Sequence, residues 1–166
     1  MKRNAVAVVA LILLASCGQR APADQAAEVT PAAAPAPENS VADALRTQAN
    51  AYYADFVRAP GMERFAIDRL GLGAEAAARL TRNMDVQTPG ALIAANGVEA
   101  LVFFGCMAHN CANAAGVLAI DTATGDVFAG VRDEAGEVIL KPNARLQMLL
   151  TQTSPTQSWA DPRRGS

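Results

Sequence analysis

The chain has 166 residues, of which 51% are hydrophobic and 18% are charged, and its formal net charge is −2. This mildly acidic balance argues against nucleic acid as a partner, because a nucleic-acid-binding surface needs an excess of Lys and Arg. The sequence contains no Ser–His–Asp set, no pair of carboxylates at a motif spacing and no phosphate-binding loop. It therefore predicts a protein that is not an enzyme and that needs no cofactor or metal.

The N-terminus has the pattern of an export signal. Lys2 and Arg3 form a positive segment, and residues 5–15 form an apolar run without a charge. The run is shorter than the roughly 20 residues of a membrane-spanning helix, but it fits the hydrophobic part of a signal peptide. Its end reads Leu14-Ala15-Ser16-Cys17, the spacing of a bacterial lipobox. We predict a lipoprotein signal peptide over residues 1–16 and a lipid anchor on Cys17; the alternative is an ordinary signal peptide with a chance cysteine.

The residue after Cys17 indicates whether the lipid anchor lies in the inner or the outer membrane. It is Gly18, where an aspartate would favour retention in the inner membrane. The sequence therefore predicts a lipid-anchored protein in the periplasm, held to the outer membrane. Cleavage before Cys17 removes Lys2 and Arg3 but no acidic residue, so the formal net charge changes from −2 to −4 and favours a basic partner.

The rest of the chain divides into a tether, one domain and a tail. Residues 17–39 are rich in Ala and Pro, a composition that buries too little apolar surface to fold and that extends the chain. We predict a domain over residues 40–154, which is long enough to bury a hydrophobic core, and an irregular tail over residues 155–166.

The first part of this domain has helical periodicity. Ser40 and Asp43 have the three-residue spacing of a capping box. Apolar residues then recur on one helical face before Pro60-Gly61, and they are Val41, Leu45, Tyr52 and Phe56. We predict one helix from Ser40 that Pro60-Gly61 ends, a short helix over residues 62–70 and a third helix over residues 74–84.

The second part of the domain has five short apolar segments with turn signals between them, of which Asn96-Gly97 is the strongest. The connections are too short for parallel crossovers, so the strands must be antiparallel. The central segments are apolar without alternation, as is typical of strands covered on both faces. A further helix from Ala144 places three leucines on one face. We predict an α+β fold with a five-stranded antiparallel sheet between helices, in three layers. The predicted strands are Ala91–Ala94, Val98–Phe104, Gly116–Ile120, Val127–Val131 and Glu137–Leu140.

One loop between two of the most apolar strands contains the only histidine of the chain. It reads Cys106-Met107-Ala108-His109-Asn110-Cys111. With Cys17 lipidated, Cys106 and Cys111 are the two cysteines left in an oxidising compartment, so we expect a disulfide between them. A ring this small adds only about 2 kcal/mol in the chain-entropy model. Its expected effect is to make the loop rigid, which lowers the entropy lost on binding.

The residues alone leave other interpretations of this loop open. A zinc site would use both thiols and His109, but the run is too tight for tetrahedral geometry and lacks a fourth ligand nearby. A catalytic thiol–histidine pair would need reduced cysteines. The loop also differs from the Cys-x-x-Cys-His motif that attaches c-type haem. A plain structural staple in a hairpin is the simplest alternative.

The pattern Gly-Cys-x-x-His-x-Cys between two strands resembles the signature of the Ivy family, the inhibitors of vertebrate (C-type) lysozyme. The resemblance covers mainly residues 87–140. It implies a five-stranded antiparallel sheet with helices on both faces. It also implies that the loop enters the lysozyme cleft, where the residue matching His109 contacts the two catalytic carboxyl groups.

This loop differs from the family's usual Cys-Lys-Pro-His-Asp-Cys at three positions. Met107 and Ala108 stand where the family has Lys-Pro, and Asn110 stands where it has Asp. The changes remove a proline that stiffens the loop and a charge that would face a basic lysozyme. We therefore expect a changed affinity or a different choice of target.

The leading hypothesis is a lipid-anchored lysozyme inhibitor that uses the loop from Cys106 to Cys111. One alternative is an inhibitor or regulator of the bacterium's own lytic transglycosylases, and another is a structural or assembly lipoprotein of the envelope. A homodimer is compatible with each hypothesis.

Overall fold

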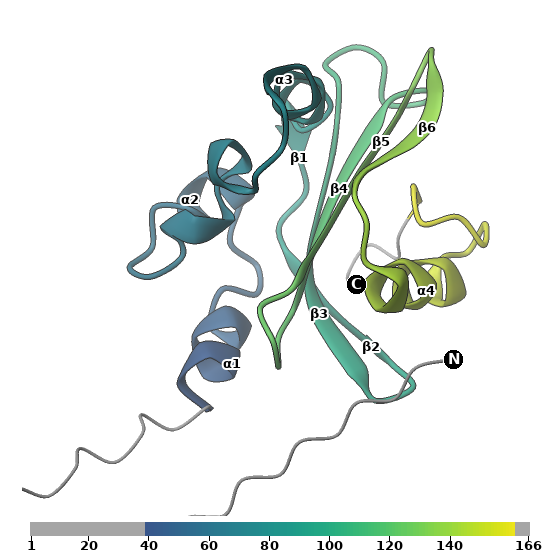
Figure 1. Ribbon diagram of the computed structural model, residues 1–166. Coiled ribbons are helices and arrows are strands. Elements are labelled where there is room, and N and C mark those ends of the chain that lie inside the picture. The colour runs from purple at the N-terminus through teal and green to yellow at the C-terminus, as the bar shows by residue number, and fades with distance from the viewer. Residues whose placement is uncertain (1–38, 162–166) are drawn as a thin grey trace, which may run out of the picture. The chain divides into compact units, whose positions relative to one another are not determined.

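The computed structural model describes residues 39–161, and Figure 1 shows how their helices and strands are arranged. One antiparallel sheet lies between helices in this part of the chain. The elements in chain order are α1 (Asn39–Arg46), α2 (Tyr53–Phe56), η1 (Glu63–Phe65), η2 (Ile67–Arg69), α3 (Ala74–Arg82), β1 (Val86–Gln87), β2 (Ala91–Ala95), β3 (Val98–Cys106), β4 (Ala115–Asp121), β5 (Val127–Asp133), β6 (Gly136–Lys141) and α4 (Ala144–Thr153).

The sheet has the order β1-β3-β4-β5-β6, and β2 pairs with β3 as well. Every pairing is antiparallel. Asn96 and Gly97, between β2 and β3, have φ values of 51° and 74°, as a type I′ hairpin turn requires. The five predicted strands correspond to β2–β6, and the predicted α+β class is confirmed. Strand β1 was not predicted, because two residues are too few to show a period.

Side chains of the central strands alternate between two apolar layers, one on each face of the sheet. The layer under α1–α3 contains the strand residues Leu101, Phe103, Leu118, Ile120, Val127, Ala129 and Val131. The layer under α4 contains Ile93, Ala100, Val102, Phe104, Val117, Ala119 and Phe128. Because β3 and β4 supply both layers, their sequences are apolar without alternation. The predicted helices on both faces are confirmed (Figure 1).

The C-terminal segment closes the second layer. Asn143 caps α4, and its side-chain oxygen accepts a hydrogen bond from the Leu146 N–H at 3.1 Å. The three leucines of the predicted face are buried: Leu146, Leu149 and Leu150. After α4, Trp159 packs edge-on against Phe128, with ring centroids 5.4 Å apart. A Cβ at Gly130 would overlap the Trp159 ring, so the glycine makes room for the indole.

The prediction of one continuous helix between Ser40 and the Pro60-Gly61 pair is wrong. The chain forms α1 and α2 instead, and Asn50 between them has φ 71°, which a right-handed helix does not allow. The Asn50 N–H donates to the Gly90 carbonyl, and the Gly90 N–H donates to the Ala51 carbonyl, both at 2.8 Å. Contact with a distant part of the chain therefore replaces the local helical hydrogen bonds.

Two further helical details differ from prediction. Tyr52, which was placed on the apolar face, is 50% exposed, and Tyr53 is buried in its place. The Tyr53 hydroxyl donates to the Phe65 carbonyl at 3.0 Å. Burial raises the pKa of Tyr53, which keeps the hydroxyl a donor. The short helix predicted over residues 62–70 is a pair of single 3-10 turns, η1 and η2.

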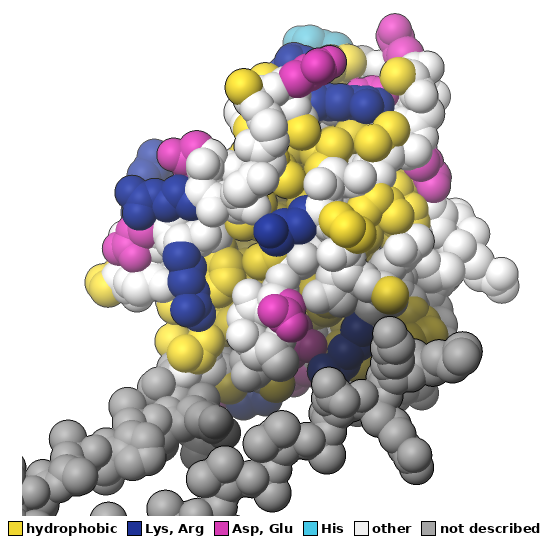
Figure 2. Space-filling model, viewed as in Figure 1, with side chains coloured by type: hydrophobic (Ala, Val, Ile, Leu, Met, Phe, Trp, Pro, Cys, Tyr) yellow, Lys and Arg dark blue, Asp and Glu magenta, His cyan; other side chains and the backbone are white. Residues whose placement is uncertain are grey.

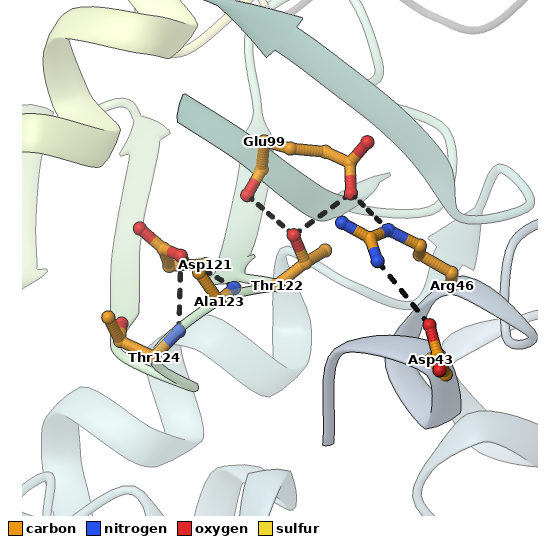
Figure 3. A network of polar contacts seen from close by, with 7 residues as sticks. All are labelled: Asp43, Arg46, Glu99, Asp121, Thr122, Ala123 and Thr124. Carbon is orange, nitrogen blue, oxygen red and sulfur yellow. Dashed lines mark hydrogen bonds and ion pairs between the residues drawn. The ribbon is translucent and has the colours of Figure 1, made fainter. Parts of the chain in front are cut away.

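A polar network joins α1 to the end of the sheet that lies opposite the cysteine loop (Figure 3). Arg46 Nε donates to Glu99 Oε1 at 2.7 Å, and Thr122 Oγ1 donates to the same oxygen at 2.9 Å. The Arg46 hydrogen bond holds the pKa of Glu99 below its usual range. Asp121 Oδ1 accepts from the backbone N–H groups of the following turn. The network therefore ties α1 to the start of β3 and to the residue after β4.

The predictions for residues 1–38, which include the signal peptide, Cys17 and nearly all of the tether, lie outside the described residues. Within residues 39–161, no helix has the length and apolar character needed to cross a bilayer.

Candidate functional site

The cysteine loop joins β3 to β4 at one end of the sheet. β3 ends at Cys106 and β4 begins at Ala115. Cys106 and Cys111 form a disulfide, with Cα atoms 5.0 Å apart, so the predicted bridge is confirmed. Cys106 is buried, whereas Cys111 is exposed, so the bridge ties the outer part of the loop to the core.

Two consecutive turns shape the chain inside this loop. The Asn110 N–H donates to the Met107 carbonyl at 3.0 Å and closes the first turn. The N–H groups of Asn113 and Ala114 both donate to the Asn110 carbonyl, at 3.1 and 2.9 Å. The Asn113 side chain also donates to Asn110 Oδ1 at 3.2 Å. The loop thus has internal hydrogen bonds in addition to its covalent closure.

His109 occupies the third position of the first turn and is exposed. Its φ is +64°, and a positive φ at this position alone is the arrangement of a type II turn, which favours Gly or Asn there. A left-handed conformation costs a non-glycine residue roughly 1–2 kcal/mol, and such residues cluster at binding and catalytic sites. Among the described residues, His109 has no hydrogen bond or ion pair. Figure 2 shows the histidine side chain, in cyan, at the molecular surface.

Close backbone packing holds the base of the loop. Gly105 and Gly116 face each other across β3 and β4. A Cβ at Gly105 would lie 2.7 Å from Met84 Cα, and a Cβ at Gly116 would lie 2.6 Å from the Asn83 carbonyl oxygen. Only glycine permits this approach of the segment after α3. Strand β1 continues that segment and pairs with Cys106, so three elements fix the direction in which the loop leaves the sheet.

An ion pair fastens the neighbouring hairpin to α3. Arg79 Nε and Nη2 donate to the two carboxylate oxygens of Asp133 at 2.7 and 2.5 Å. The two side chains are only 19% and 20% exposed. The Arg79 hydrogen bonds hold the pKa of Asp133 below its usual range, so the carboxylate is charged and paired.

The disulfide limits the chemical groups that the loop can offer. Both sulfurs are in the disulfide, so neither cysteine is a free nucleophile or a thiolate ligand. Within residues 39–161, no group of three His, Cys, Asp or Glu side chains is arranged to hold a metal ion. The imidazole of His109 offers two ring nitrogens to a partner, on opposite sides of the ring.

Comparison with known proteins identifies the family. A model of the family described as inhibitor of vertebrate lysozyme (Ivy) matches residues 69–161, more than half of the chain. The chain belongs to this family. The Ivy match extends from the end of η2 through α3, the whole sheet, the cysteine loop and α4 to the packed Trp159 segment. Searches of curated proteins and of solved structures returned no match.

Membership in the Ivy family implies lysozyme inhibition, with lysozyme as the partner. The resemblance seen in the loop sequence is thereby confirmed. The binding role of the six residues from Cys106 to Cys111 stays a prediction, and the structure places all of them together at one end of the sheet. Sequence reasoning missed the elements that hold the loop: β1, the contacts of Gly105 and Gly116, and the Arg79–Asp133 pair.

The disulfide provides a first test of the loop's role. We expect the double variant Cys106→Ser/Cys111→Ser to inhibit lysozyme at least about tenfold less well, because a loosened loop loses entropy on binding. The free energy of unfolding should fall by about 2 kcal/mol at most. Inhibition kinetics and thermal unfolding of the same sample measure both effects. Undiminished inhibition would reduce the bridge to a structural staple.

Proposed function

We propose that this protein inhibits C-type lysozyme by inserting the Cys106–Cys111 loop into the active-site cleft, with His109 at its tip. The observation that carries the proposal is the state of His109, which is exposed, unpaired among the described residues and held at a positive φ. A rigid loop pays little further entropy on binding. The loop contains no glycosidic bond for lysozyme to cleave, so it would block the cleft without being hydrolysed.

The geometry of lysozyme's reacting groups suits one imidazole. A retaining glycosidase holds its two carboxyl groups about 5–5.5 Å apart. The two ring nitrogens of His109 point to opposite sides and can each meet one carboxyl group. Hydrogen bonds to charged groups contribute roughly 1.5–3 kcal/mol each. The same contacts would occupy both groups that the reaction needs.

An activity assay tests this proposal directly. Purified chain from residue 18 onward keeps every described residue and should inhibit egg-white C-type lysozyme acting on peptidoglycan. A lytic transglycosylase assayed in parallel decides between the two classes of muramidase. Inhibition of the transglycosylase alone would replace the proposed target, and inhibition of neither enzyme would overturn the proposal.

We also propose that the mature protein is anchored by lipid on Cys17 and faces the periplasm. The lipobox Leu14-Ala15-Ser16-Cys17 supports this, and Gly18 favours the outer membrane. Labelled fatty acid should enter the wild-type protein but not a Cys17→Ala variant. Equal labelling of both would leave the protein without the proposed anchor.

A further inference from the structure

A groove lies directly beside the cysteine loop. It has a volume of about 720 Å³ and is open to solvent. One wall is the outer part of the loop, including Asn110 and Asn113. The other is the β5–β6 hairpin, including Arg132, Glu134 and Glu137. A partner that binds the outer part of the loop can therefore also contact the β5–β6 hairpin.

The charged residues that line the groove lie on the β5–β6 hairpin and not on the loop, and they are three carboxylates and the cation Arg132. From Cys106 to Ala114 the chain has no acidic residue and no Lys or Arg. Of the carboxylates that line the groove, Asp133 is already paired with Arg79. Glu137 accepts a hydrogen bond from Ser158 at 3.2 Å. Glu134 is exposed and has no hydrogen bond or ion pair among the described residues.

The turn that carries Glu134 is well supported. Asp133 pairs with Gly136 across the hairpin, which places Glu134 at its tip. The Ala135 N–H donates to Asp133 Oδ1 at 3.0 Å, and that carboxylate is fixed by Arg79 on α3. These hydrogen bonds fix the backbone that carries the Glu134 carboxylate. A partner that binds this carboxylate therefore causes little further loss of backbone entropy.

We propose that the β5–β6 turn is a second contact element for lysozyme, and that Glu134 receives a Lys or Arg side chain from the rim of the lysozyme cleft when the cysteine loop is inserted. The inference rests on the proposed function. In this proposal Glu134 on the turn supplies the negative charge that Asn110, inside the loop, does not carry. A rim charge of this kind mainly accelerates association and makes it sensitive to salt.

Binding kinetics of the chain from residue 18 onward with egg-white C-type lysozyme test the inference. Glu134→Gln should lower the association rate constant about three- to tenfold at low salt and leave the dissociation rate constant nearly unchanged. The difference should disappear at 1 M salt, where the Debye length is only about 3 Å. Where the partner cation is a lysine, zero-length carbodiimide cross-linking should join it to Glu134.

Glu63→Gln is the matched control, because it removes the same charge at the other end of the sheet. Glu63 is exposed and precedes Arg64, which lies beside Gly125 in the β4–β5 turn. The association rate constant of Glu63→Gln should equal that of the wild type. If Glu134→Gln associates with lysozyme as fast as the wild type while His109→Ala binds lysozyme more weakly, the second contact is overturned and the proposed function stands. No binding by the wild type would overturn both.

Discussion

Replacing His109 with alanine should weaken binding to C-type lysozyme by about 2–4 kcal/mol, roughly 30- to 1000-fold, and leave the fold intact. The side chain is exposed and has no hydrogen bond or ion pair among the described residues, so its removal costs the folded state little. In the complex it would lose hydrogen bonds to two charged carboxyl groups, each worth roughly 1.5–3 kcal/mol. Inhibition constants and thermal unfolding of the purified variant measure the two quantities separately.

A His109→Gly variant separates the imidazole from the backbone that presents it. Glycine adopts φ +64° without strain, so this variant keeps the turn and should unfold no more easily than the wild type. If the imidazole is the inhibiting group, His109→Gly should be as poor an inhibitor as His109→Ala. Full inhibition by either variant would show that the loop blocks the cleft by its shape alone.

The loop was predictable because its signals are local. Cys106 and Cys111 are five residues apart, the segment connects two apolar strands, and His109 lies between the cysteines. The strands were predictable for a related reason, since short connections leave only antiparallel neighbours. These features depend on residues that are adjacent in sequence, and the structure confirms the strands and the disulfide.

The missed features depend on residues that are distant in sequence. The break between α1 and α2 follows from the hydrogen bonds of Asn50 and Ala51 with Gly90, about 40 residues away. The packing of Gly105 against Met84 cannot be read from either residue alone. The groove beside the loop forms because the β3–β4 connection and the β5–β6 turn lie at the same end of the sheet. Only the strand order reveals this arrangement. Local periodicity contains none of this information.

Phe103→Ala should have the opposite effect to His109→Ala and lower the free energy of unfolding by about 3–5 kcal/mol. Phe103 is fully buried, and its ring centroid lies 4.7 Å from that of Phe56 and 5.4 Å from that of Tyr53. The same ring fills the space above Gly90, where a Cβ would lie 2.7 Å from its Cε1 atom. Truncation therefore leaves a cavity where α2, the Gly90 segment and β3 meet. Chemical denaturation measures the loss, and Phe103→Leu should lose less because it keeps more apolar volume.

The inhibitory potency of Phe103→Ala then decides how far the loop depends on the core. Phe103 is only three residues before Cys106 on β3, but the base of the loop is held by its own contacts with the segment after α3 and by the disulfide. At a temperature where the variant remains folded, we expect its inhibition constant to stay within about twofold of the wild type, a difference of about 0.4 kcal/mol. A loss comparable to that of His109→Ala would mean that the direction of the loop is set by the packing of the whole first layer. Retained potency would locate the inhibitory geometry in the loop and the backbone segments that touch it.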